Sequence, residues 1–406
     1  MRIAMIMNGF PEISEKFLIN QVSGLLEAGI DLDIYAAVRP SGSMRHFAAE
    51  RYGMYDRTRY TRAARSTKTR VLDAPRLILS NFWSNPVAAT RALSTKRYAT
   101  AARNLKTLYF LEAFGKERYD IVHCHFGPNG LTGSFLKDSG IAKALIVTFH
   151  GSDINSYPSR HGTNVFRYLY ERADLITANT SFTKGKLVAN GCPEGKIAIL
   201  PVGLRMEEYE FPKERVSRDE ATLLTVGRLV EKKGHRYLMD ALPSLRTRFS
   251  ALRWRIIGDG PFMNVLRDHA KELGVSEIVS FEGTKNDQDV AAAYMSSTVF
   301  VLPSVTATDG DMEGQGLVIQ EAQASRLPVV STLHNGIPDG LLDGRSGILV
   351  PEKDSPALAD AIGRLLSDKD LRETYGNAGR DFVAETYDIP LLTKRTVDLY
   401  ESCITS

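Results

Sequence analysis

The sequence predicts an α/β protein built from two doubly wound domains. Short runs of Val, Ile and Leu alternate with segments of helical periodicity in the N-terminal half, and the same alternation starts again after residue 220. Fully apolar strands separated by helices indicate parallel sheets that are covered on both faces. The length of 406 residues exceeds one ordinary core, and it suits two domains of about 150–200 residues each.

Strands of the first series are predicted where short apolar runs occur. The chain opens with one at 2–7, and a loop then leads into a helix from about Glu15 to Ala28. Further strands of this series are expected at 31–37, 120–124, 144–149, 174–178 and 196–200. The second series begins at Thr222–Val226, and its later strands are expected near 254–257, 278–281, 298–302, 328–331 and 347–350.

A break in this alternation predicts the domain boundary. From Pro201 to about Glu220 the chain combines glycine, prolines and many charges with little periodicity. We therefore expect an N-terminal domain at 1–203, a C-terminal domain at 204–385, and a helix at 386–406 that packs back on the N-terminal domain. In open α/β sheets, ligands bind beyond the carboxyl ends of the strands. Two domains that face each other would therefore place a site in the cleft between them.

Bulk composition excludes several classes of protein. A formal net charge of +3 is too small to imply nucleic-acid binding by itself. Three widely spaced cysteines, Cys124, Cys192 and Cys403, support neither a disulfide framework nor a cysteine-rich metal site and fit a reducing compartment. The apolar N-terminus reaches Asn8–Pro11 too soon for a signal peptide, and no stretch approaches the roughly 20 apolar residues that cross a bilayer. We expect a cytoplasmic protein.

Residues 57–106 form a basic segment that interrupts the alternation. They hold 12 Lys and Arg residues but one acidic residue, Asp73. Aromatic and aliphatic residues are interleaved with the charges, namely Tyr60, Leu72, Leu77, Ile78, Leu79, Phe82, Trp83 and Tyr98. This mixture favours helices that lie on an anionic membrane surface, which predicts a peripheral protein at the inner face of the cell membrane. A solvated helical hairpin is the alternative, and nucleic-acid binding is disfavoured because no recognition motif accompanies the charge.

The loop at 306–316 has the composition of a phosphate-binding loop. It follows the strand expected at 298–302 and precedes a helical run at 317–326. Its three glycines let the backbone approach a ligand closely, and the start of the next helix offers free N–H groups to an anion. Carboxylates at Glu313 and Glu321 could bind sugar and ribose hydroxyls. The loop therefore predicts a nucleotide-sugar site, although similar units bind other phosphates.

Further motifs occur in a fixed order along the C-terminal half. Seven residues separate Glu313 from Glu321, with Gly-Leu-Val between them and Glu-Ala at the second. The accompanying motifs are Val226–Gly234, Ile256–Pro261, Phe281–Gly283, Leu302–Ser304 and Asp343–Gly347. Together these residues resemble the signature of the retaining glycosyltransferases of family 4. The resemblance implies the GT-B architecture, with two Rossmann-like domains facing across a cleft.

Motifs of the N-terminal half resemble one branch of that family. Phe10–Phe17, His123–Gly127 and Thr148–Asp153 are similar to segments of the enzymes that assemble colanic acid and other exopolysaccharides. Lys16 departs from the Thr that is common in this branch, and Asp339 departs from the usual Glu of the family. The second difference could alter a contact at a helix start.

The resemblance also assigns roles to individual residues. Arg228 and Lys233 would hold the donor diphosphate and stabilise the charge on the departing nucleotide. Glu313 would contact donor-sugar hydroxyls near the reacting carbon, Glu321 would hold the ribose, and His150 would touch the donor sugar. The predicted catalytic residues are thus His150, Glu313, Arg228 and Lys233. Further predicted donor contacts are Gly9, Gly258, Gly283, Gly314, Gly316, Leu317, Val318 and Glu321.

The acceptor side is predicted from fewer residues. Asp153, Glu15 and His125 are expected to contact a glycan or lipid-linked acceptor, and Asp153 could instead orient His150. UDP is the expected nucleotide from the habit of the family. No residue is an obvious covalent nucleophile, so a front-face displacement is the hypothesis. An epimerase on the same scaffold and a non-catalytic nucleotide-sugar-binding subunit remain alternatives.

Two patterns that could bind a metal are interpreted otherwise. Asp309 and Asp311 could hold a divalent cation against a diphosphate, but Arg228 and Lys233 would offset the same charge. The stretch His123–His125 has a cysteine between two histidines on a strand, where neighbouring side chains face opposite ways. We therefore expect neither a metal nor another cofactor.

Overall fold

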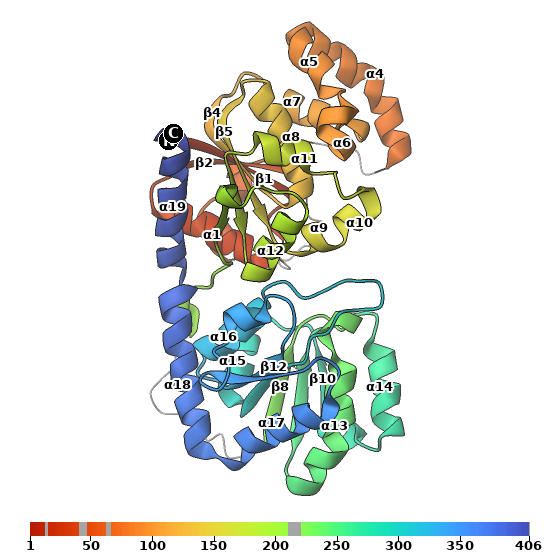
Figure 1. Ribbon diagram of the computed structural model, residues 1–406, viewed down its shortest axis with the longest axis vertical. Helices are drawn as coiled ribbons and strands as arrows, with labels where there is room; N and C mark the ends of the chain where they lie inside the picture. The colour runs from red at the N-terminus through yellow and green to blue at the C-terminus, as the bar shows by residue number, and fades with distance from the viewer. Residues whose placement is uncertain (13–14, 40–46, 62–65, 210–220, 406) are drawn as a thin grey trace. The chain divides into compact units, whose positions relative to one another are not determined.

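The computed structural model describes residues 1–12, 15–39, 47–61, 66–209 and 221–405 (Figure 1). The chain divides into two compact units. Unit 1 comprises Met1–Val202 and Ile389–Ser406, and unit 2 comprises Gly203–Asp388. Most of the predicted boundary stretch, 210–220, lies outside the described residues. Unit 2 extends past the predicted end at 385, because Leu204 pairs with Asp388 in an isolated parallel bridge.

Unit 1 contains, in its described residues, a seven-stranded parallel sheet with the order β3-β2-β1-β4-β5-β6-β7. In the centre of the sheet, Ile3 lies opposite Leu32 on one side and Ile121 on the other. The strand order reverses between β1 and β4, which is where open α/β sheets bind ligands. The strands are β1 Arg2–Gly9, β2 Asp31–Val38, β3 Thr58–Tyr60, β4 Tyr119–His125, β5 Ala142–Phe149, β6 Leu175–Ala178 and β7 Ile197–Ile199.

Helices cover both faces of this sheet. One apolar cluster lies between the strands and α8, and a second lies between the strands, α1 and α19. Burial on both faces explains why the strands are continuously apolar. The helices are α1 Lys16–Glu27, α2 Phe47–Arg51, α3 Met54–Arg57, α4 Thr67–Ser84, α5 Pro86–Ala92, α6 Thr95–Arg103, α7 Lys106–Phe114, α8 Gly127–Asp138, α9 Ser152–Asn155, α10 Tyr157–His161, α11 Arg167–Arg172, α12 Ser181–Ala189 and α19 Ile389–Thr405, with a 3-10 turn η2 at Glu194–Lys196.

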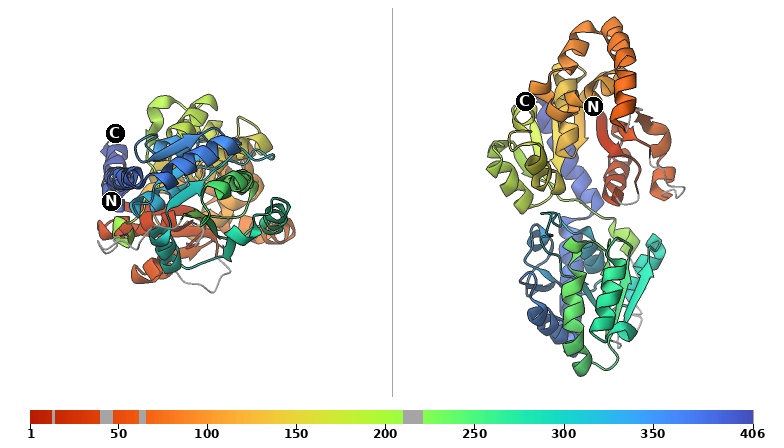
Figure 2. Two further views of the ribbon diagram at one scale, coloured as in Figure 1. Left: turned by 90° about the horizontal axis from the view of Figure 1, so that it is seen from below. Right: turned by 90° about the vertical axis from the view of Figure 1, so that its right-hand side faces the viewer.

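The basic segment is mostly helical. Helices α4 and α5, orange in Figures 1 and 2, lie at the margin of unit 1 and pack on α7 rather than on the strands. The strand β3, which pairs Thr58 with Ile34 at the edge of the sheet, is not among the predicted strands. Three residues are too few to show an alternating pattern. Positions 62–65, which carry two of the arginines, lie outside the described residues.

Unit 2 contains, in its described residues, a six-stranded sheet with the order β10-β9-β8-β11-β12-β13, and all its strand pairs are parallel. Its strand order reverses between β8 and β11. The strands are β8 Thr222–Val226, β9 Arg253–Ile257, β10 Val279–Gly283, β11 Val299–Leu302, β12 Val329–Thr332 and β13 Gly347–Val350. The helices are α13 His235–Arg248, α14 Met263–Glu272, α15 Asp287–Ser296, α16 Leu317–Ala324, α17 Ser355–Ser367 and α18 Lys369–Thr386, with 3-10 turns η3 Met206–Tyr209, η4 Glu231–Lys233, η5 Ser276–Ile278 and η6 Ile337–Gly340.

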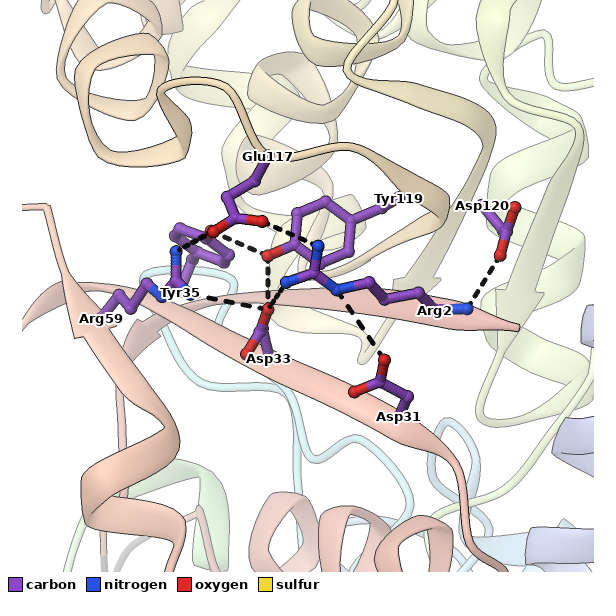
Figure 3. A network of polar contacts seen from close by, with 8 residues as sticks. All are labelled: Arg2, Asp31, Asp33, Tyr35, Arg59, Glu117, Tyr119 and Asp120. Atoms are coloured by element: carbon purple, nitrogen blue, oxygen red, sulfur yellow. Dashed lines mark hydrogen bonds and ion pairs between the residues drawn. The ribbon is translucent and has the colours of Figure 1, made fainter.

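A polar network closes the amino edge of the first sheet (Figure 3). The guanidinium of Arg2 bonds Asp33 at 2.8 Å and Glu117 at 2.7 Å, and it lies over the ring of Tyr119. Arg59 on β3 also bonds Glu117, at 3.2 Å. The network joins the four strands β1 to β4 at the edge opposite their carboxyl ends, so it stabilises the pairing of the strands rather than forming a ligand site of this fold.

The C-terminal helix α19 packs on the first sheet beside α1. Its buried Tyr400 hydroxyl lies 2.7 Å from Nδ1 of His123 on β4. The other nitrogen of His123 lies 2.7 Å from the Thr148 hydroxyl on β5. No helix in the described ranges is both long and apolar enough to cross a bilayer.

Candidate functional site

The predicted donor residues of unit 2 follow β8 and β11, the two strands at the reversal of strand order, and also lie at the ends of β9 and β10. Because all these strands are parallel, their carboxyl ends meet at one edge of the sheet. This edge is the expected ligand site of an open α/β sheet.

Lys233 and Glu313 meet at this edge. Lys233 ends the short turn η4 after β8, and its ammonium nitrogen lies 2.5 Å from a carboxylate oxygen of Glu313 in the loop after β11. Both side chains are largely buried, with 11% and 13% of their surface exposed. Burial alone would raise the pKa of Glu313, but Lys233 and Lys232 lower the pKa to about 2. Glu313 is therefore an ionised, acceptor-only carboxylate.

The two loops are also tied by backbone contacts. Gly234 has φ +66°, and a Cβ atom there would lie 1.8 Å from the carbonyl oxygen of Pro303. The ammonium of Lys232 bonds Asp311 and the Met312 carbonyl, each at 3.1 Å. Only glycine permits the close approach of Gly234 to Pro303, and this contact holds the turn that carries Lys233 against the end of β11.

The start of α16 carries the remaining residues of the predicted loop. Gly316 has φ +75° and precedes the helix, while Leu317 and Val318 are half-buried in its first turn. Glu321 accepts a hydrogen bond of 2.9 Å from the Tyr294 hydroxyl. The helix ends at Ala324, before the predicted limit, and Arg326 has φ +53°.

Arg228 and two predicted glycines lie at the ends of β8, β9 and β10. A Cβ atom on Gly258 would meet the Gly227 carbonyl oxygen at 1.9 Å, and the Gly258 N–H donates to Gly283 at 2.9 Å. The three strand ends are thus in backbone contact. Arg228, which follows Gly227, is exposed, and its guanidinium has no hydrogen bond or ion pair with the part of the chain that the structure describes.

The predicted acceptor residues lie in unit 1, at the carboxyl ends of β1, β4 and β5. Gly9 and His150, two predicted donor contacts, belong to the same edge. The space over Gly9 is filled by Glu12, because a Cβ atom would lie 2.0 Å from its carboxylate. Glu15 is nearby, and burial together with Glu12 raises its pKa to about 7.

His125 and His150 form a stacked pair. Nδ1 of His125 lies 3.1 Å from Nε2 of His150, and the ring centroids are 5.3 Å apart. Phe17 and Phe126 pack on the His150 ring. Burial lowers the pKa of His150 to about 3 and moves that of His125 well below its ordinary value. Both rings are therefore neutral at physiological pH.

Asp153 is a backbone anchor in this structure. One carboxylate oxygen accepts the N–H of Gly127 at 2.9 Å, and the other accepts those of His150 and Gly151 at 3.1 and 3.0 Å. This placement favours the predicted orienting role for His150 over direct contact with an acceptor.

Neither possible metal pattern gathers ligands. Asp311 is paired with Lys232, and Asp309 accepts the N–H of Asp311 at 2.9 Å. Cys124 faces α8, where it limits the space at Gly133, whereas the His123 and His125 rings lie 4.6 Å apart. Within the described ranges, no three His, Cys, Asp or Glu side chains are grouped to hold an ion.

Sequence reasoning missed several residues that support these edges. They are Lys106, Lys232, Tyr294, His334, Asn335 and Glu352. Lys232 directly precedes the predicted Lys233, so its position in the same motif could have indicated a role at this edge. The others act through partners far along the chain, which no local motif reveals.

Comparison with known proteins identifies related chains. The model described as Glycosyltransferase Family 4 matches residues 14–208, and that described as Glycosyl transferases group 1 matches residues 206–382. A protein of Salmonella typhimurium provisionally named colanic acid biosynthesis glycosyltransferase WcaL is 32% identical, across 99% of this chain and 100% of the relative. Amylovoran biosynthesis glycosyltransferase AmsK of Erwinia amylovora is 28% identical, across 90% of each.

Solved structures share the fold. The crystal structure of Anabaena Alr3699/HepE in complex with UDP has a TM-score of 0.74 and covers 99% of this chain and 100% of its own. Its sequence identity of 16% means that the likeness concerns the fold alone. Two parallel-sheet, Rossmann-like units constitute the GT-B fold predicted from the motifs.

Proposed function

The chain belongs to glycosyltransferase family 4 and is a glycosyltransferase, and from this premise we propose its reaction. It transfers a hexosyl group from a UDP-sugar to a hydroxyl of a glycan or lipid-linked acceptor in exopolysaccharide assembly, with retention at the anomeric carbon. The observation that carries this proposal is the Lys233–Glu313 pair beside the start of α16.

The arrangement of charge at this edge suits a nucleoside diphosphate sugar. The exposed guanidinium of Arg228 and the ammonium of Lys233 supply positive charge, and the start of α16 adds free N–H groups. The ionised Glu313 supplies an acceptor for sugar hydroxyls, and Glu321 lies one turn into the helix for those of ribose. The cationic side chains can bind the phosphates of such a ligand, and the neighbouring carboxylate can accept hydrogen bonds from its sugar hydroxyls.

The chemical step follows from these groups. The bond between the anomeric carbon and the diphosphate oxygen breaks while the acceptor oxygen bonds the same face of that carbon. The acceptor proton passes to the departing phosphate. Arg228 and Lys233 stabilise the charge that grows on this phosphate, where such stabilisation is most effective. We propose that no metal is needed, because protein cations do the same work and Asp311 is engaged by Lys232.

The substrates are proposed from the relatives. UDP is proposed from the habit of the family, and HepE, which shares the fold, was itself solved with UDP. WcaL and AmsK are named for colanic acid and amylovoran, which supports an exopolysaccharide acceptor.

A transfer assay tests this proposal. The protein is incubated with UDP-, GDP- and ADP-sugars and a lipid-linked glycan extract, with and without EDTA, and products are identified by mass spectrometry and NMR. We expect a glycoside that keeps the donor's anomeric configuration, formed from UDP-sugar and insensitive to EDTA. An epimerised donor, an inverted linkage, or donor binding without any product would refute the corresponding part of the proposal.

We further propose that unit 1 binds the inner face of the cell membrane through α4. Lys68, Leu72, Arg76, Leu79 and Trp83 recur every three or four residues and therefore share one face of the helix. Leu72, Leu79 and Trp83 are 77%, 71% and 95% exposed. Apolar side chains flanked by basic ones on an exposed helix suit an anionic lipid surface.

Tryptophan fluorescence tests this surface directly. The chain has two tryptophans, and Trp254 is fully buried, so a change on adding lipid reports Trp83. We expect a blue shift with vesicles of phosphatidylcholine and phosphatidylglycerol, and a weaker one with phosphatidylcholine alone. Leu72→Ser with Leu79→Ser should reduce binding, whereas Val265→Ser, an exposed apolar residue of unit 2, should not. If anionic vesicles cause no shift, this face of α4 does not bind the membrane, and a protein partner becomes the alternative.

A further inference from the structure

A buried histidine connects Glu313 to a second carboxylate. Nε2 of His334, just after β12, lies 3.2 Å from the backbone nitrogen of Glu313. Nδ1 of His334 lies 2.6 Å from a carboxylate oxygen of Glu352, just after β13. The His334 side chain is 1% exposed, so both contacts are sheltered from water.

The partners fix the proton on this imidazole. An ionised carboxylate can only accept a hydrogen bond, so Nδ1 of His334 carries the hydrogen. The backbone N–H of Glu313 can only donate, so Nε2 accepts it. Burial would raise the pKa of Glu352, but bonds from His334 and the Thr306 N–H lower it, which keeps the carboxylate charged. One neutral tautomer therefore satisfies the whole chain of contacts.

Glu352 also holds the other end of the donor loop. Its second carboxylate oxygen accepts the Thr306 N–H at 2.8 Å. The loop is thus fastened to one carboxylate at Thr306 directly and at Glu313 through His334. The two attachment points lie on either side of Asp309, Gly310 and Asp311.

The backbone N–H, the backbone carbonyl and the side-chain carboxylate of Glu313 each contact a side chain from another loop or turn. His334 accepts its N–H, the Asn335 side-chain amide donates to its carbonyl, and Lys233 pairs with its carboxylate. A loop residue held at all three points has little freedom to rotate. Fixing a group in its working position before the ligand arrives is what productive geometry requires.

We propose that His334 and Glu352 are positioning residues that set the place of Glu313 against the donor sugar. This inference rests on the proposed function, since it takes Glu313 to contact the donor sugar. His334 acts through the Glu313 backbone, and Glu352 acts through His334 and Thr306. Neither is assigned contact with the donor.

The test compares His334→Leu, which removes both polar contacts, with His334→Gln, whose amide offers one donor and one acceptor. In Glu352→Gln, the amide NH2 group replaces one carboxylate oxygen and faces either Nδ1–H of His334 or the Thr306 N–H, so one of these two donors loses its acceptor. His269→Leu is the matched control, because His269 forms a carboxylate pair of the same 2.6 Å length with Asp240 elsewhere in unit 2.

We expect His334→Leu and Glu352→Gln to lower kcat for sugar transfer on the order of 100-fold, the effect of a misplaced catalytic group. UDP affinity should stay within about twofold, since Glu313 is proposed to contact the sugar rather than the nucleotide. His334→Gln should recover much of the loss. His269→Leu should leave kcat unchanged. A His334→Leu enzyme with parental kcat, or one whose UDP affinity falls as far as its kcat, would overturn the proposal.

A second readout does not depend on catalysis. Hydrogen–deuterium exchange of peptides covering 306–316 should accelerate in His334→Leu and not in His269→Leu, because the Glu313 N–H loses its acceptor. Unchanged exchange would overturn the positioning role even if no donor is ever turned over. Altered exchange in a protein that transfers no sugar would uphold the contacts and reject the proposed function instead.

Discussion

The ammonium of Lys233 and the carboxylate of Glu313 lie 2.5 Å apart in a largely buried pair. Two residues with different predicted roles, one for the diphosphate and one for the sugar, are therefore in contact with each other. Each offsets the charge of the other, so neither can be removed without leaving a buried, uncompensated partner.

Removing one member of this pair should affect both stability and activity. Lys233→Met leaves Glu313 unpaired, and unfolding of unit 2 should become easier by about 3 kcal/mol. The double variant Lys233→Met with Glu313→Gln should recover most of this stability but no transfer activity. Urea denaturation and the transfer assay measure the two effects. Full activity in Lys233→Met would show that the site is assigned wrongly.

Gly234 and Gly274 provide a matched test of the tight turn before α13. Both have nearly the same left-handed φ, +66° and +64°, but a Cβ atom would strike the Pro303 carbonyl only at Gly234. Gly274→Ala should cost about 1 kcal/mol for the backbone alone. Gly234→Ala should cost about 3 kcal/mol or more, because backbone must move. It should also lower kcat by displacing Lys233. Equal melting temperatures for the two variants would contradict this account.

The buried histidines should make unit 1 sensitive to acid. Burial lowers the pKa of His123 and His150 from 6.5 to about 3. Between these values the unfolded chain binds more protons, so stability falls as pH drops below about 6.5. Asp153 opposes part of this trend, because burial raises its pKa to about 6.

Urea midpoints at pH 7.5 and 5.5 measure this dependence. His123→Gln should reduce the loss between the two pH values by about 1.4 kcal/mol, the value of one proton over one pH unit. The exposed His161→Gln is the control and should behave as the parent does. The same pH dependence in parent and His123→Gln would disprove the assignment.

Lys106 should lose its proton at a lower pH than an ordinary lysine does. Its ammonium bonds side-chain oxygens of Asn8 and Asn129 at 3.2 and 2.6 Å, and burial lowers its pKa to about 8. Pulse labelling with acetic anhydride across a pH series, read by mass spectrometry, should give a half-maximal rate near pH 8. Lys106→Met removes the corresponding peptide signal and serves as the control. A half-maximal rate near the ordinary value of 10.5 would contradict the shift.

The strands could be predicted from sequence because each buried strand is a run of consecutive apolar residues. Every residue from Ile3 to Met7 is buried, and the prediction at 2–7 needed nothing else. The short edge strand β3 could not be found, because three residues with one buried side chain have no pattern. Its place is decided by pairing with β2, a contact between distant segments.

The same distinction separates the parts of the site. Lys233 and Glu313 belong to local motifs, and both were predicted, but their mutual contact was not. His334 reaches Glu313 from another strand end, and its neighbours carry no signal of that contact. Gly9 is a further example, because the resemblance predicts that it contacts the donor, whereas the Glu12 carboxylate beside it appears only in the folded structure. A local motif can indicate which residues have a functional role, whereas the partners of those residues are brought together only by the fold.

The return of α19 to the first sheet has a consequence for the order of synthesis. Unit 2 is an insertion, since the chain leaves unit 1 at Val202 and re-enters it at Ile389. The buried Tyr400 contacts His123 of unit 1 and follows all of unit 2 in the sequence. Unit 1 therefore cannot acquire this buried contact until every residue of unit 2 has been synthesised.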